Sequence, residues 1–178
     1  AQGVITKWNQ VREGFPDKEI HLFGAGTDSG TFDYFTEAIN GKSAASRGDY
    51  TASEDDNVLV EGVGSDPNAL GYFGLAYYSQ NKDRLKLVGI DDEKSGNGEG
   101  PILPSVETVM NSTYQPLARP IFIYVSTEAA KKLYIKSFIE YYLKNAATLV
   151  EEVGYIPLQP ESYDAAMYRF NSGIKGSV

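Results

Sequence analysis

The sequence contains no cysteine and only one histidine, and these absences restrict the chemistry that the chain can support. Without thiols, neither disulfide bonds nor thiolate metal centres can form, and cysteine usage gives no information on the redox compartment. With His21 as the single imidazole, a conventional catalytic triad is hard to assemble except around Ser29.

Positive charge and long apolar runs are also scarce. Sixteen Lys and Arg residues face 24 Asp and Glu residues, which gives a net charge of −8 and a pI near 4.7. This balance opposes a broad contact with phosphate backbones, so we expect no nucleic-acid partner. No run approaches the roughly 18 apolar residues of a membrane span. The opening residues AQGVITKWNQ lack the regions of a signal peptide, which predicts either a cytosolic protein or a mature or trimmed chain.

Short apolar segments alternate with helical patterns, which is typical of an α/β fold with a parallel or mixed sheet. The segment EIHLFGAG (19–26) predicts a strand that runs into a tight turn. Apolar residues within 32–39 recur with helical spacing, and this helix is expected to end at Asn40 and Gly41. The other expected elements are a helix at 53–63 capped by Ser53, a strand leading into a helix at 69–78, strands at 85–90 and 119–126, a surface loop at 91–105, and helices at 126–145, 145–154 and 160–170.

The turn before the helix at 32–39 has the composition of an anion site. Ser29, Gly30 and Thr31 place unpaired backbone N–H groups and two hydroxyls at one helix start. The alternative is a capped helix, in which Asp28 or Ser29 satisfies the N-terminus of its own helix. The stretch is neither a P-loop, because no lysine follows, nor a nucleophile elbow, because the G-x-S-x-G spacing is missing.

This turn and its surroundings resemble a known family. DSGTFDYF, preceded by KWNQVREGFPDKEIHLFG and followed by RGDYTASEDDNVLVEGVGSDPNALGYFGLAYYSQNKDRLKLVGID and YQPLARPIFIYVS, is similar to the phosphate-binding protein of the high-affinity phosphate ABC transporter. These PstS-like proteins belong to the type II periplasmic binding proteins. The resemblance implies a two-lobed α/β protein that closes on inorganic phosphate and delivers it to an ABC transporter permease, at the periplasmic or extracellular face, without catalysis or a cofactor.

The resemblance also implies individual ligand contacts. Ser29, Gly30 and Thr31 would donate hydrogen bonds to phosphate. Asp28 would either cap the helix, which we favour, or accept the proton of a protonated phosphate and so help reject sulfate.

One position departs from the family pattern, because Ala25 stands where many members carry an arginine. A cationic ligand must therefore come from elsewhere or be dispensed with, and Arg47 is the candidate ligand, held in a bidentate geometry by Asp49. An ordinary surface contact between Arg47 and Asp49 is the alternative. The acidic run 54–56 could suggest a metal, but negative charge at a helix start explains it, so no metal site is expected.

The resemblance covers only the second half of the family's length. It predicts an anion-binding lobe at 1–116, with a sheet flanked by helices, and a strand and helix segment at 117–178 that returns to an incomplete first lobe. The return segment would expose an apolar face, which predicts either a homodimer or a missing N-terminal fragment as partner.

Two other functions stay open at this stage. One is a serine-dependent hydrolase or phosphatase in which Ser29 is the nucleophile and His21 or Asp28 the base. The other is a binding protein for a different oxyanion, such as sulfate or molybdate.

Overall fold

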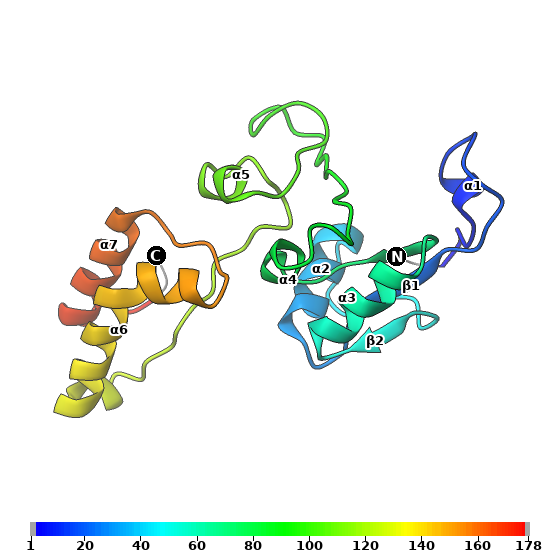
Figure 1. Ribbon diagram of the computed structural model, residues 1–178. Helices are drawn as coiled ribbons and strands as arrows, with labels where there is room; N and C mark the ends of the chain where they lie inside the picture. Colours follow the sequence, from blue (N-terminus) through cyan, green and yellow to red (C-terminus); the bar gives the residue numbers. More distant parts are fainter. Residues whose placement is uncertain (1–2, 177–178) are drawn as a thin grey trace. The chain divides into compact units, whose positions relative to one another are not determined.

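A computed structural model describes residues 3–176 (Figure 1). The chain divides into two compact units, with the boundary in the sequence between Val88 and Gly89. The assignment of residues 1–116 to an anion-binding lobe and of residues 117–178 to the first lobe stays a prediction. None of the helices within 3–176 is long and apolar enough to cross a membrane. The elements are α1 (Trp8–Val11), β1 (His21–Ala25), α2 (Gly30–Asn40), β2 (Thr51–Ser53), α3 (Asp56–Ser65), β3 (Ala69–Gly71), α4 (Leu75–Ser79), α5 (Val106–Met110), the 3-10 helix η1 (Ala129–Lys131), α6 (Leu133–Glu152) and α7 (Pro160–Asn171).

The first unit is built on a three-stranded parallel sheet with the order β2-β1-β3. This arrangement confirms the α/β class and the strands predicted within 19–26 and 69–78. Strand β2 was not predicted, because its three residues are too few to show alternation.

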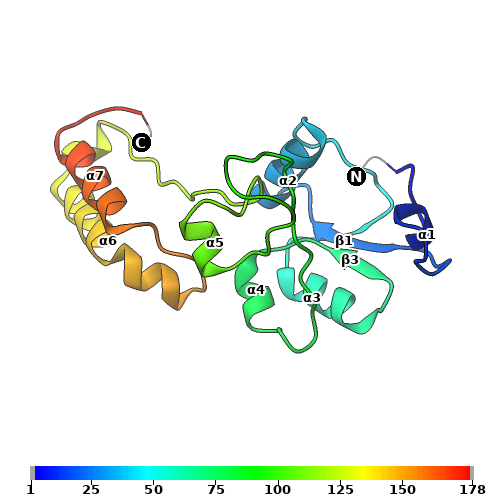
Figure 2. The same cartoon turned by 90° about the horizontal axis from the view of Figure 1, so that it is seen from above.

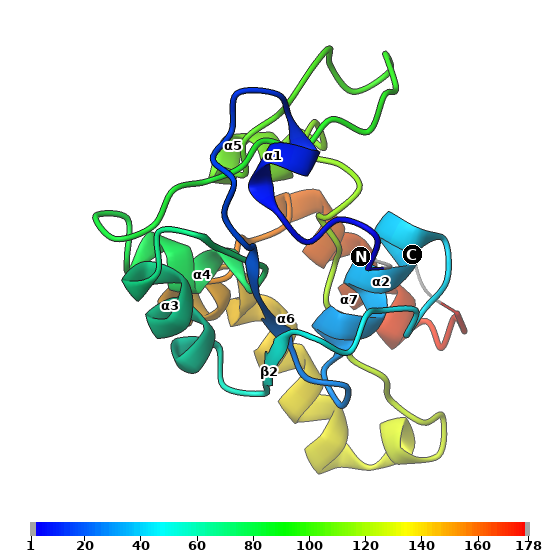
Figure 3. The same ribbon diagram turned by 90° about the vertical axis from the view of Figure 1, so that its right-hand side faces the viewer.

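Helices α2 and α3 cover opposite faces of this sheet (Figures 2 and 3). On one face, Phe23 packs so closely against Gly62 of α3 that a Cβ there would lie 2.2 Å from the ring. On the other face, Gly24 leaves room for the ring of Tyr72, which stacks on Phe35 of α2 at a centroid distance of 3.8 Å. Since consecutive strand residues point to opposite faces, these contacts assign one helix to each face.

The two crossovers bring the carboxyl ends of β1 and β2 together. Their register ends with Ala25 opposite Ser53. The chain leaves β1 for α2 on one face, whereas it leaves β2 for α3 on the other face. The sheet edge between these two strand ends is therefore a topological switch point, the usual ligand position in open α/β sheets.

The ends of the two helices test the predicted capping residues. Helix α2 ends before Gly41, whose φ of 70° is the left-handed conformation expected of a C-terminal glycine. Helix α3 begins later than predicted, because Ser53 ends β2 and the cap is Asp55, whose Oδ1 accepts the N–H of Asn57 at 2.9 Å. The prediction of Ser53 as the cap was therefore wrong.

The second unit is helical in the residues that the structure describes. The helices predicted at 126–145 and 145–154 form one helix, α6, that begins at Leu133, because the preceding residues form a turn and η1. Helix α6 packs against α7, the helix predicted at 160–170. Ile139 and Ala146 are the buried residues of α6.

The strands predicted at 85–90 and 119–126 are wrong. Ile90 makes only an isolated antiparallel bridge with Ile102. In 119–126 no strand forms, and Ile121 and Tyr124 are 64% and 91% exposed. A β-forming segment needs an adjacent strand for its backbone hydrogen bonds. The second unit has no other strand among its described residues.

Candidate anion-binding site

The turn after β1 places the start of α2 at the switch point between the carboxyl ends of β1 and β2. Ser29 is the N-cap, because its Oγ accepts the N–H of Thr31 at 3.1 Å, while its own N–H donates to the carbonyl of Gly26 at 3.1 Å. The capped-helix interpretation is thus confirmed for Ser29. The preference for Asp28 as the cap was wrong: within 3–176, its exposed carboxylate makes no hydrogen bond.

Several donors at this helix start are open. The N–H of Gly30 and the hydroxyl of Thr31 bond to no group among residues 3–176. Gly30 is exposed, whereas Ser29 and Thr31 are half-buried, so neighbouring side chains do not cover the turn. The dipole of an 11-residue helix adds partial positive charge here. This arrangement can hold an anion with uncharged donors.

Sequence reasoning missed two residues that flank the turn. Glu54, the residue after β2, accepts the N–H of Asp28 with its Oε1 at 3.2 Å. The hydroxyl of Tyr50 donates to the carbonyl of Ala25 at 3.1 Å. Burial, and secondly the charge of Glu54, raise the pKa of Tyr50, which therefore stays a neutral donor. Placing β2 correctly would have revealed Glu54 as a residue at the sheet's carboxyl edge.

Asp56 is the half-buried acidic residue at this edge. Burial raises the pKa of its carboxyl group, and the hydrogen bond from the Gly74 N–H opposes that shift. This contact joins the first residue of α3 to the N-cap of α4. In the part of the chain from 3 to 176, no three His, Asp or Glu residues are grouped so that they could hold a metal ion.

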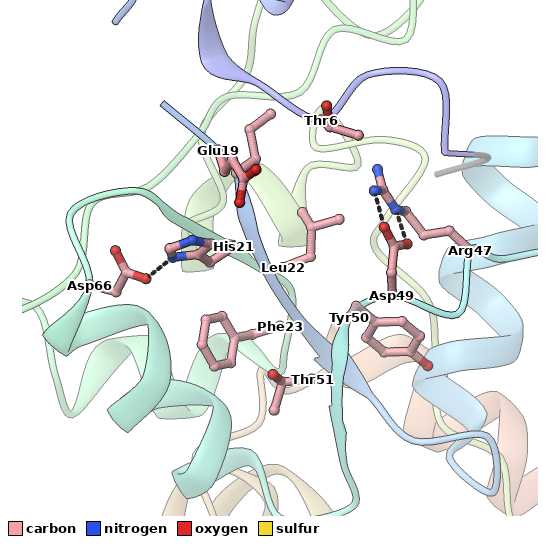
Figure 4. A pocket seen from close by; sticks show the side chains of 11 residues that line it. Thr6, Glu19, His21, Leu22, Phe23, Arg47, Asp49, Tyr50, Thr51 and Asp66 are labelled. Carbon is pink, nitrogen blue, oxygen red and sulfur yellow. Dashed lines mark hydrogen bonds and ion pairs between the residues drawn. The ribbon is translucent and has the colours of Figure 1, made fainter. Parts of the chain in front are cut away.

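Arg47 lies at the other end of the sheet (Figure 4). Its Nε and Nη2 each donate to the Asp49 carboxylate at 2.5 Å, and Nη1 donates to the carbonyl of Ile5 at 2.9 Å. This pairing lowers the pKa of Asp49 to about 2. The predicted bidentate geometry is confirmed, but Arg47 lines an open cavity of about 600 Å³ with His21, at the amino end of β1. The structure therefore does not bring Arg47 to residues 28–31.

His21 is also remote from Ser29. It begins β1, and its Nδ1 is hydrogen-bonded to the Asp66 carboxylate. The strand between His21 and Ala25 alone spans roughly 13 Å, at about 3.3 Å per residue. The predicted alternative of a Ser29 nucleophile with His21 as its base was therefore wrong.

Comparisons with known proteins agree with this architecture. Residues 1–146 match a family model described as a PBP superfamily domain. Protein SphX of Synechocystis sp. is 51% identical over 179 residues, which cover 100% of this chain and 52% of that protein. Phosphate-binding protein PstS of Staphylococcus haemolyticus is 33% identical over 164 residues, which cover 90% of this chain and 49% of that protein.

A solved structure is similar over nearly the whole chain. The crystal structure of "a possible phosphate binding protein" from Planctomyces limnophilus has a TM-score of 0.79 and 46% sequence identity. The match covers 97% of this chain and 60% of that one. The chain spans about half the length of the curated relatives it matches.

Proposed function

This chain belongs to the PBP superfamily, and on that premise we propose that it binds inorganic phosphate as part of the substrate-binding component of an ABC-type importer. The observation that carries the proposal is the start of α2, where the Gly30 N–H and the Thr31 hydroxyl are open at a topological switch point. The ligand is suggested by relatives named for phosphate binding.

Ser29, Gly30 and Thr31 supply the donors in this proposal. A net charge of −8 does not prevent anion binding, because local dipoles act at contact distance whereas distant surface charges are screened by salt. Asp28, which caps nothing, offers an exposed acceptor for the proton of a protonated phosphate. Arg47, whose guanidinium is engaged at the opposite end of the sheet, has a structural role here.

The proposal places the protein at the periplasmic or extracellular face, beside a membrane permease, without a catalytic role. One lobe provides only part of the donors of a closed clamp, so this chain alone binds phosphate weakly. An anion held by neutral donors and a helix dipole needs neither a nucleophile nor a general base.

We further propose a partner surface in the second unit, the apolar surface 121–138. It comprises exposed side chains that a complete first lobe would cover: Ile121, Phe122, Ile123, Tyr124, Leu133, Tyr134 and Phe138. Apolar surface of this kind on a soluble domain marks an interface. Since the relatives are about twice as long as this chain, the occupant we propose is the segment that completes the first lobe. A second copy of the chain would take its place when that segment is absent.

Calorimetric titration of the chain with phosphate, run beside a turnover assay with a phosphate ester, tests the function. The expected result is weak, saturable phosphate binding without ester hydrolysis, and competition by sulfate and molybdate ranks the oxyanions. Undetectable phosphate binding at millimolar concentration would contradict the proposal. Ester hydrolysis that is lost in Ser29→Ala would instead identify a hydrolase.

A further inference from the structure

Glu54 and Gly26 occupy equivalent places at the carboxyl edge of the sheet. Each is the first residue after a strand, since the β1–β2 register ends with Ala25 opposite Ser53. The N–H of Gly26 continues the ladder by donating to the carbonyl of Ser53 at 3.0 Å. Backbone pairing therefore places the residue that follows β2 next to the turn that follows β1.

The carboxylate of Glu54 lies against the backbone of this turn. A Cβ added at Gly26 would meet Glu54 Oε1 at 1.9 Å and Cδ at 2.7 Å, so the Glu54 carboxylate occupies the space beside the Gly26 backbone that a side chain would otherwise fill. The same Oε1 accepts the N–H of Asp28 at 3.2 Å. Glu54 thus contacts both the beginning of the turn and the residue before the helix cap.

We propose that Glu54 is a positioning residue for the turn 26–31, an inference that rests on the proposed phosphate site. The bond to Asp28 holds the residue before Ser29, and so sets the direction in which the Gly30 N–H and the Thr31 hydroxyl point. This contact costs anion affinity at the same time, because Glu54 places a negative charge beside the bound anion. The hydrogen bond that Glu54 accepts therefore raises phosphate affinity and its negative charge lowers it, and substitutions can separate these two effects.

Glu54→Gln and Glu54→Ala separate the two effects. Both remove the charge, but only glutamine keeps an acceptor for the Asp28 N–H. We expect Glu54→Gln to bind phosphate about three- to tenfold more tightly than Glu54→Ala, the range for one hydrogen bond. The matched control is Glu37, an exposed residue of α2, at which the glutamine and alanine variants should bind phosphate equally.

Amide hydrogen exchange of Asp28 without ligand provides a second readout that a general loss of stability would not produce. Exchange at this one amide should be faster in Glu54→Ala than in Glu54→Gln, with the amides of β1 unchanged in both. Equal phosphate affinities for the two variants, or equal exchange at Asp28, would overturn the proposal. If the alanine variant does not fold, Glu54→Asn replaces it, because its side chain is uncharged like that of glutamine but is one carbon shorter, which withdraws the acceptor and should give the same two effects.

The two proposals fail in different ways. A wild-type chain that binds no phosphate contradicts the proposed function alone. In that case, the difference in Asp28 amide exchange between Glu54→Ala and Glu54→Gln still tests whether Glu54 positions the turn 26–31.

Discussion

In the proposed site, the single hydroxyl group of Ser29 has two roles, and substitutions can separate them. Its Oγ accepts the N–H of Thr31 and so caps α2, while its O–H is free to donate to a bound anion. Ser29→Ala removes both the cap and the donor. Ser29→Asp keeps an acceptor that caps a helix as well as serine does, but it replaces the donor with a negative charge.

The expected magnitudes differ between stability and binding. Loss of the cap in Ser29→Ala costs about 0.5–2 kcal/mol of unfolding free energy. Loss of one hydrogen bond to an anion costs about 1.5–3 kcal/mol, so phosphate affinity falls about ten- to hundredfold. Ser29→Asp should unfold like the wild type, because the cap is retained. Its carboxylate, about 4 Å from the anion at an effective dielectric constant of about 20, repels it by about 4 kcal/mol, roughly a thousandfold in affinity.

Urea denaturation and phosphate calorimetry measure these two quantities on the same samples. Ser105 is the matched control, since it caps α5 by accepting the N–H of Thr108 at 3.1 Å. Ser105→Ala should lose stability by the same mechanism and bind phosphate like the wild type. If Ser29→Asp bound phosphate as tightly as Ser29→Ala, the anion could not lie at the start of α2, and the proposed site would be refuted.

Two further predictions concern charge and the apolar surface. Because Arg47 depresses the pKa of Asp49 from 3.8 to about 2, the pair stabilises the fold above pH 3.8 and loses this effect as the pH falls towards 2. The difference in urea midpoint between wild type and Asp49→Asn should therefore shrink over that interval, and a constant difference would contradict the linkage. Phe122→Ser should reduce self-association of the chain in sedimentation velocity without lowering its stability. The control is Leu103→Ser, which should leave association unchanged, because Leu103 is 52% exposed and Phe122 50% exposed but Leu103 lies outside the apolar surface 121–138. Equal association of the two variants would count against the partner surface.

The sequence predicted the elements that carry their own signals. The strand at β1 and the end of α2 follow from alternation and from a glycine after the helix, and the structure confirms both. The cap of α2 was open between two residues, because Asp28 and Ser29 are both good capping residues, and the structure places it at Ser29 rather than at Asp28. Strand β2 has no such signal, because three residues cannot establish a period and Ser53 also fits a helix cap. Missing it hid Glu54, whose importance depends on the neighbouring strand rather than on its own sequence context.

The wrong prediction of a strand at 119–126 has the opposite cause, because here the local sequence signal is strong and a neighbouring strand is missing among the residues that the structure describes. The local preference of IFIYV for a strand is strong, but a strand becomes stable only when a second one satisfies its backbone groups. Within the described residues of the second unit that second strand is missing, and Ile121 and Tyr124 stay exposed. A β-forming segment that remains extended and exposed agrees with the proposed partner surface, since a partner would supply the missing strand.

The position of the proposed anion site follows from topology more than from Ser29, Gly30 and Thr31 themselves. Once β2 is placed beside β1, right-handed crossovers send α2 and α3 to opposite faces, and the two loops that leave the sheet must diverge. Where the two loops diverge, the turn 26–31 lies against Glu54. A serine-glycine-threonine step on a helix elsewhere in the chain would have the same donors but would not lie at a switch point. The same reasoning accounts for the position of Arg47, because a residue that precedes β2 is carried to the amino edge of the sheet, away from the donors.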